Sequence, residues 1–97
     1  MTVAGDILRT ATTLVEGDRA EQNGDAVRTH ANMARLWSAY LTSATGREIV
    51  LEPMDVANMM ELFKIARRLN GRLNPDDFVD GAGYAALAYA CAAAGSS

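Results

Sequence analysis

Cysteine is nearly absent from this chain: its 97 residues contain a single one, Cys91. One thiol cannot close an internal disulfide, and it cannot build a zinc cluster from cysteine ligands. Cys91 lies in an alanine-rich run close to the end of the chain. We therefore expect it to be a small buried apolar side chain rather than a reactive group.

Runs of one charge sign are also missing. Nine Lys and Arg residues and twelve Asp and Glu residues are mixed along the chain, and the formal net charge is −3. Without a basic arm or run the sequence lacks the electrostatic footprint of a phosphate-backbone binder, so we expect no direct binding to nucleic acid. The longest apolar run, residues 85–94, falls well short of a membrane span. The first residues do not form a signal peptide. These absences predict a cytoplasmic protein without a membrane partner.

Large apolar side chains are scarce as well. The hydrophobic fraction is 49% but aromatic residues make up only 6%, and alanine, which buries little area, accounts for much of the rest. A chain of this length forms one domain. We expect a thin core in the monomer and therefore a homo-oligomer.

Apolar residues recur with the period of an α-helix, and no strand-like alternation competes with it. The pattern predicts four helices, at residues 4–16, 26–44, 53–70 and 75–93, with a disordered tail at 95–97. Gly17 and Gly46 end the first two helices. Pro53 and Pro75 suit the first turns of the last two. Short connections favour an all-α fold, a compact four-helix antiparallel bundle-like domain.

The helices differ in how they are expected to pack. Trp37 should anchor the core as the largest burial in the chain. The third helix is apolar around most of its circumference, which is typical of a central helix. Gly81 and Gly83 would weaken an isolated fourth helix, so we expect them to permit close helix–helix approach. The second helix presents an expected core face made of Met33, Trp37, Tyr40, Leu41 and Ala44.

The stretch from Lys64 to Tyr84 carries the most specific polar pattern. Asp77, Asp80 and Tyr84 share one helix face because they are spaced by three and four residues. With Glu61, the two aspartates could hold a divalent cation, since hard cations prefer carboxylate oxygens. The alternative is structural: Asp76 and Asp77 complement the helix dipole, and Asp80 pairs across the interface with Lys64 or Arg67, Lys64 being the first choice.

Basic side chains and one loop are further candidates. Lys64, Arg67 and Arg19 could receive phosphate groups. Asp18 lies in the polar loop of residues 17–25, and loops often carry function. His30, at the edge of the expected core, is more typical of a hydrogen-bonded structural residue than of a catalytic base.

Two groups of motifs resemble a small family of phage and prophage proteins of unknown function. The first half matches at residues 17–19, 24–25, His30 and 36–41, and the second at 55–57, 59–60, 64–67 and 79–86. The resemblance implies an all-helical domain in a bacterial host cell and no established activity. The chain is also remotely similar to MazG-like all-α nucleoside triphosphate pyrophosphohydrolases, which bind Mg²⁺ through paired carboxylates on two helices. Lys64 stands where that family has a second carboxylate, which argues against the likeness.

Two functional hypotheses follow. The first is a non-enzymatic helical module, without a cofactor, that oligomerises or binds another protein. The second is a domain that binds or hydrolyses nucleotides with Mg²⁺. In the first, Lys64 and Asp80 pair directly, whereas in the second the acids converge on an open pocket.

Overall fold

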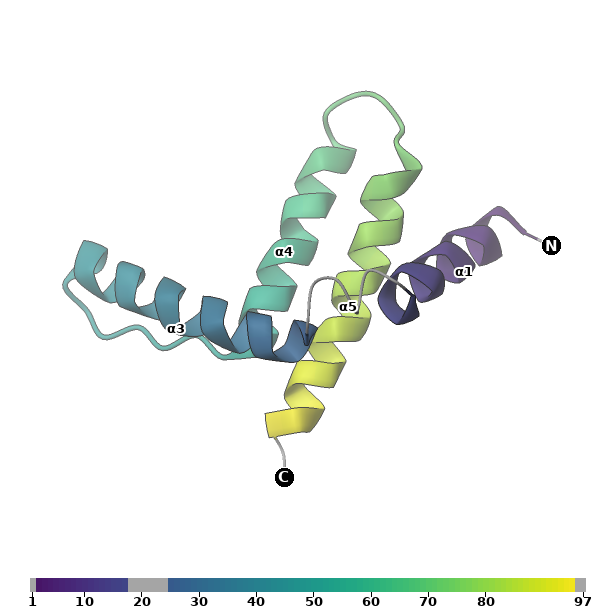
Figure 1. Ribbon diagram of the computed structural model, residues 1–97. Helices are drawn as coiled ribbons and strands as arrows, with labels where there is room; N and C mark the ends of the chain where they lie inside the picture. The colour runs from purple at the N-terminus through teal and green to yellow at the C-terminus, as the bar shows by residue number, and fades with distance from the viewer. Residues whose placement is uncertain (1, 18–24, 96–97) are drawn as a thin grey trace.

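The computed structural model describes residues 2–17 and 25–95 (Figure 1). These residues form four helices and no strand: α1 (Val3–Glu16), α3 (Ala26–Thr45), α4 (Pro53–Arg68) and α5 (Pro75–Gly95). The all-α, four-helix prediction is confirmed, and every helix begins and ends within two residues of its expected position. Gly95 belongs to α5 rather than to a tail. None of the described helices has the length and apolar character needed to cross a bilayer.

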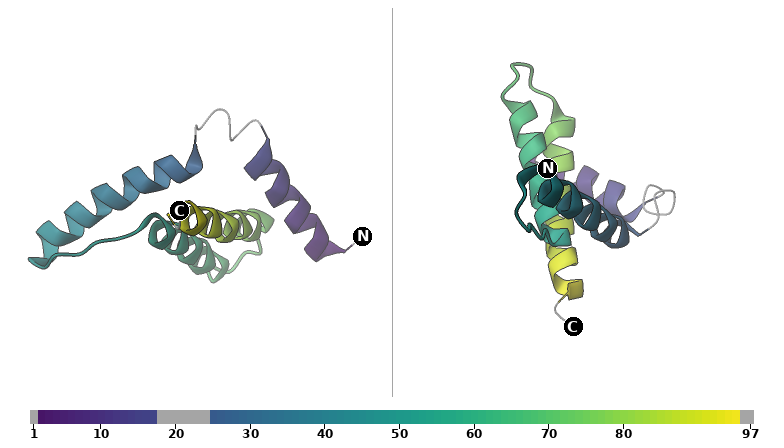
Figure 2. Two further views of the ribbon diagram at one scale, coloured as in Figure 1. Left: turned by 90° about the horizontal axis from the view of Figure 1, so that it is seen from below. Right: turned by 90° about the vertical axis from the view of Figure 1, so that its left-hand side faces the viewer.

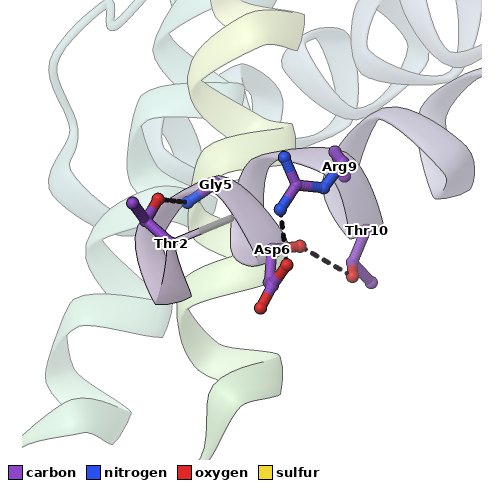
Figure 3. Close-up of polar contacts among 5 residues, drawn as sticks. All are labelled: Thr2, Gly5, Asp6, Arg9 and Thr10. Carbon is purple, nitrogen blue, oxygen red and sulfur yellow. Dashed lines mark hydrogen bonds and ion pairs between the residues drawn. The ribbon is translucent and has the colours of Figure 1, made fainter.

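The helix ends follow the capping signals in the sequence. Figure 3 shows the start of α1, where the Thr2 hydroxyl accepts a hydrogen bond from the Gly5 amide at 2.9 Å. One turn on, Asp6 pairs with Arg9 at 2.5 Å. The Thr10 hydroxyl donates to the Asp6 carbonyl. This end of α1 therefore satisfies its polar groups locally.

The other three helices are capped in different ways. Asp25 accepts from the Val27 amide at the start of α3, and Gly46 ends that helix with φ 71°, a conformation that favours glycine. At the start of α4, Glu52 and Asp55 form a reciprocal capping box. Asn74 accepts from the Asp76 amide at 3.0 Å and caps α5.

Helices α4 and α5 form an antiparallel pair, and the other two helices lie across it (Figures 1 and 2). Helix α1 packs against α5 on the side away from α4, and α3 extends away from the base of the pair. Helix α5 contacts all three other helices. The expectation that the third helix is central was wrong, because the small side chains of α5 let its neighbours approach from several sides.

The core is thin, as expected. Apart from His30 and Asp77, its buried side chains are small, and Val56 is the largest that is fully enclosed. Within the described residues the buried apolar set is Ala11, Ala34, Val56, Ala57, Val79, Ala88 and Cys91. The burial expected for Cys91 is confirmed.

Two expectations for the second helix were wrong. Trp37 is only partly buried, so it does not anchor the core, and Tyr40 is exposed. The physical reason is that the residues of α3 that the other helices bury, His30 and Ala34, lie in its first half. Its second half extends beyond the α4–α5 pair (Figure 1).

The segment after α3 turns back and lies along that helix. The Ser38 hydroxyl accepts a hydrogen bond from the Leu51 amide at 2.8 Å. The Thr42 hydroxyl accepts from the Ile49 amide at 3.0 Å. Side chains of α3 thus satisfy the backbone of a segment without secondary structure.

Candidate functional site

Lys64 of α4 and Asp80 of α5 form an ion pair across the helix interface. The Lys64 Nζ lies 3.0 Å from an Asp80 carboxylate oxygen, and the two side chains are 16% and 28% exposed. The sequence-based pairing of these residues is confirmed. Both groups are largely shielded from water, so each depends on the other for its polar partner.

A second ion pair lies one helical turn away. Arg67 donates from Nε to the Asp77 carboxylate at 2.7 Å, and the Asp77 side chain is 5% exposed. This hydrogen bond, with the charge of Asp77, raises the pKa of Arg67 above its ordinary value. The sequence offered Asp77 as a metal ligand or as a complement to the helix dipole, not as the partner of Arg67. The sequence does contain a signal for this contact. In an antiparallel pair, a step of one turn forward on one helix meets a step of one turn backward on the other. Arg67 follows Lys64 by one turn and Asp77 precedes Asp80 by one turn, so the Lys64–Asp80 pair implies the second pair.

Arg68 fills the space beside these pairs, and sequence reasoning missed this role too. Its guanidinium carbon lies 4.4 Å from the centre of the Phe78 ring, a cation–π arrangement. A Cβ atom added at Gly81 would collide with the guanidinium. Gly81 was expected to let two helix backbones approach closely. It instead makes room for the Arg68 side chain.

The three proposed metal ligands do not form one cluster. Asp77 and Asp80 each face a cation of α4. Throughout the described ranges, no group of three or more His, Cys, Asp or Glu side chains is placed to share a metal ion. The Mg²⁺ site with Glu61 stays a prediction.

A cavity of about 850 Å³ lies between α1, α3 and α5. His30, Lys64, Asp80 and Tyr84 all line it, so four of the candidate residues meet there. His30 is buried, its Nδ1 lies 2.9 Å from the Ala26 carbonyl oxygen, and its ring centre lies 6.2 Å from that of Tyr84. The expected hydrogen bond of His30 is thus present at Nδ1, whereas its Nε2 is buried without a hydrogen-bond partner. Asp18 and Arg19 lie outside the described residues.

The outer face of α4 is apolar and bare. Leu62 and Leu69 are 62% and 81% exposed. The other members of this face are also exposed, and none carries a charge. We call the set the α4 stripe: Met59, Leu62, Phe63, Ala66 and Leu69.

The stripe borders the ion pairs at Phe63, whose ring centre lies 5.5 Å from the Lys64 Nζ and 5.9 Å from the Arg67 guanidinium carbon. Val56 and Ala57 are fully buried, and Lys64 faces α5. The sequence shows that α4 is apolar on several sides, but it does not show which side α5 covers. This is why the stripe was read as part of the core.

Comparison with known proteins decides the family. Residues 6–92 match the Domain of unknown function (DUF6378). The chain belongs to the DUF6378 family. The residues of both ion pairs and of the α4 stripe all lie within the matched range. The resemblance to a family of unknown function is thereby confirmed.

Two curated relatives of this DUF6378 domain come from mycobacteriophages. The chain is 43% identical to the Gene 55 protein of Mycobacterium phage L5 over 81 residues, which cover 84% of the chain and 49% of the relative. It is 38% identical to the Gene 55 protein of Mycobacterium phage D29 over 79 residues, covering 81% of the chain and 48% of that relative. The chain thus spans about half the length of the curated relatives it matches. No solved structure matches it.

Proposed function

We propose that this DUF6378 domain is a helical protein-interaction module of a phage protein that acts in the bacterial cytoplasm. The α4 stripe is its binding surface. The observation that carries the proposal is the row of five uncharged apolar residues on a helix whose opposite side is already packed. Contiguous apolar surface of this kind marks interaction sites in folded proteins.

The extent of the whole surface supports an interaction. The chain exposes 6972 Å², whereas a compact monomer of 10.4 kDa should expose about 5,400 Å². Its radius of gyration is 14.9 Å, against about 12.5 Å for a compact domain of 97 residues. Both quantities describe an open arrangement of helices, to which the projecting second half of α3 contributes, and they leave room for a partner without locating its site.

The energetic gain from covering the stripe is large relative to the stability of a small domain. Full burial of a Leu, Phe or Met side chain contributes about 1.5–3 kcal/mol relative to full exposure. The four large members of the stripe are partly exposed, so a partner could recover on the order of several kcal/mol from them. Because its core is thin, the domain should have a low free energy of unfolding, and a gain of this size would be a large fraction of it.

Thiol labelling tests the binding surface. We expect Ala66→Cys, in the stripe, to react several-fold more slowly with a maleimide in producing cells than Ala85→Cys, a matched exposed alanine of α5. The native Cys91 is buried and should contribute little background. Equal labelling rates at positions 66 and 85 would refute the proposed module.

A second candidate function rests on the cavity. Its volume of about 850 Å³ is that of a small-molecule site, and Lys64 and Asp80 on its wall are the residues the MazG-like hypothesis assigned to phosphate and Mg²⁺. Under this proposal a nucleotide would have to displace the ion pair between them.

A thermal-shift screen tests the second candidate. A ligand that binds only the folded state raises its melting temperature. The proposal requires a nucleoside triphosphate with Mg²⁺ to raise the Tm, and requires Lys64→Met to abolish that rise. No shift with any nucleotide at millimolar concentration would exclude it.

A further inference from the structure

We infer that the cavity between α1, α3 and α5 binds a neutral, largely apolar small molecule whose hydroxyl or N–H group donates a hydrogen bond to Nε2 of His30. The inference goes beyond the interaction module, because no residue of the α4 stripe is among the described residues that line this cavity. It also differs from the nucleotide candidate, since the ligand leaves the Lys64–Asp80 pair intact.

The first observation is an acceptor without a donor. His30 is 6% exposed. Its Nδ1 lies 2.9 Å from the Ala26 carbonyl oxygen. A carbonyl oxygen can only accept, so in the neutral ring Nδ1 holds the proton and Nε2 is the acceptor. Among the described residues nothing donates to this buried Nε2. Buried polar atoms in native proteins are nearly always hydrogen-bonded, so this one calls for a partner.

The second observation is the position of this nitrogen. Because Nδ1 turns back to the backbone of α3, Nε2 lies on the far side of the ring, away from that backbone. The His30 ring reaches toward α5, where its centre lies 6.2 Å from that of Tyr84. Both side chains line the cavity. Nε2 is shielded from bulk water, so binding would include a small side-chain movement in the wall, a common change on association.

The charge of the wall argues for a neutral ligand. Lys64 is the one cation among the described wall residues, and its Nζ lies 3.0 Å from an Asp80 carboxylate oxygen. Asp25 adds a second carboxylate. One lysine and two aspartates give this wall a formal charge of −1 when His30 is neutral. An anion would find no unpaired cation there, and its desolvation would not be compensated.

The size and remaining lining of the cavity argue for an apolar body. Leu14 and Val15 of α1 face it together with Leu87 of α5. Its volume of about 850 Å³ lies within the range of small-molecule sites, which are mostly apolar and use a few polar groups to orient the ligand. In this cavity, Nε2 of His30 would be such an orienting group.

Nuclear magnetic resonance of the imidazole nitrogens tests the inference directly. His30 is the only histidine in the sequence, so the two ring signals of ¹⁵N-labelled protein belong to it. The probe is 2-naphthol, which has an apolar body and one hydroxyl donor. In mildly alkaline buffer it should shift the Nε2 signal toward that of a hydrogen-bonded acceptor and move the Nδ1 signal much less.

Two matched compounds separate the contributions of the donor and of the charge. We expect 2-methoxynaphthalene, which has the same body without a donor, to move the Nε2 signal clearly less. The anion 2-naphthoate should bind several-fold more weakly than 2-naphthol. If 2-naphthol leaves the Nε2 signal unchanged, the inference is overturned. A free protein whose Nε2 signal is already that of a hydrogen-bonded acceptor would also overturn it, because water then supplies the donor.

Variants locate the ligand. His30→Phe keeps a flat ring and removes the acceptor, so it should lower the affinity for 2-naphthol several-fold and leave that for 2-methoxynaphthalene unchanged. If His30→Phe fails to fold, Leu87→Trp, which narrows the cavity, should weaken the binding of both compounds. Undiminished 2-naphthol binding in the folded variants would place the ligand elsewhere and overturn the inference.

A control on α4 separates this site from the other two proposals. Leu62→Gln changes the α4 stripe and should leave the affinity for 2-naphthol unchanged. Binding that Leu62→Gln weakens and His30→Phe does not would place the ligand on the stripe, which overturns the cavity site and leaves the interaction module standing. A nucleoside triphosphate with Mg²⁺ that moves the Nε2 signal, where 2-naphthol does not, would favour the nucleotide candidate and overturn the neutral ligand.

Discussion

At the scale of single residues, the contact between α4 and α5 contains two ion pairs within an otherwise apolar interface. Lys64 faces Asp80 and Arg67 faces Asp77 one turn away. Each pair fixes the relative register of the two helices, because a slip by one turn would leave a shielded carboxylate without a cation. We therefore expect these side chains to favour one register of the pair.

We expect Asp80→Ala to lower the free energy of unfolding by about 1–2 kcal/mol, because it leaves the shielded Lys64 ammonium without its carboxylate. Urea denaturation at fixed protein concentration measures this loss. In the Lys64→Met background the same substitution should cost clearly less. Strictly additive effects in this double-mutant cycle would show that the pair contributes no coupling energy.

Cys91 gives the fold a dependence on alkaline pH. Burial, followed by the charge of Asp25, raises the pKa of the Cys91 thiol. The folded state therefore holds the proton more tightly than the unfolded chain. This contribution to stability is complete below the ordinary cysteine pKa of about 8.5 and is lost as the pH rises through the higher folded value.

The measurement is urea denaturation of the wild type and of Cys91→Ala from pH 7.5 to pH 10. The wild type should lose more stability than Cys91→Ala over this range. In the same buffers the native thiol should react much more slowly with a disulfide reagent than the urea-unfolded thiol does. Parallel pH profiles of the two proteins would contradict the expected role of the thiol.

At the scale of elements, α5 shows what glycine inside a helix can do. A Cβ atom at Gly83 would lie 3.7 Å from the Val15 side chain, an ordinary contact, whereas one at Gly81 would displace the Arg68 guanidinium. Helical glycine costs up to about 1 kcal/mol relative to alanine. The two glycines should therefore respond differently to the same substitution.

We expect Gly83→Ala to raise the free energy of unfolding by about 0.5–1 kcal/mol, from helix propensity alone. Gly81→Ala should gain less than Gly83→Ala, or lose stability, because Arg68 must leave the Phe78 ring. In the Arg68→Ala background the two substitutions should give similar gains, measured by thermal or urea denaturation. A full gain from Gly81→Ala in the wild type would show that Arg68 adapts freely.

The helices and their ends were predictable because local signals determine them. Gly46, Pro53 and Asn74 act within a turn of their own positions. The Lys64–Asp80 pair was predictable too, since few partners suit a lysine in an apolar helix. Trp37 and the outer face of α4 were not predictable. The exposure of Trp37 depends on where α3 leaves the other helices, and that of the outer face of α4 on which side α5 covers. No local pattern contains that information.

At the scale of the whole molecule, the domain exposes more surface than its mass requires. If copies associate, the native state is stabilised by mass action and the melting temperature depends on protein concentration. We expect the Tm to rise by several degrees between 2 µM and 200 µM. The Tm of Leu62→Glu should stay constant over the same range. A concentration-independent Tm for the wild type would argue against coupled folding and association.

The order of the helices along the chain also bears on how the domain folds. Helices α4 and α5 are neighbours in sequence and form the antiparallel pair, whereas α1 reaches α5 across most of the chain. Local contacts form faster because they close shorter loops. We therefore expect the α4–α5 hairpin to gain protection first in pulsed hydrogen exchange during refolding, with α1 protected last. The α4–α5 hairpin would thus provide the surface on which α1, which precedes it in the sequence, docks.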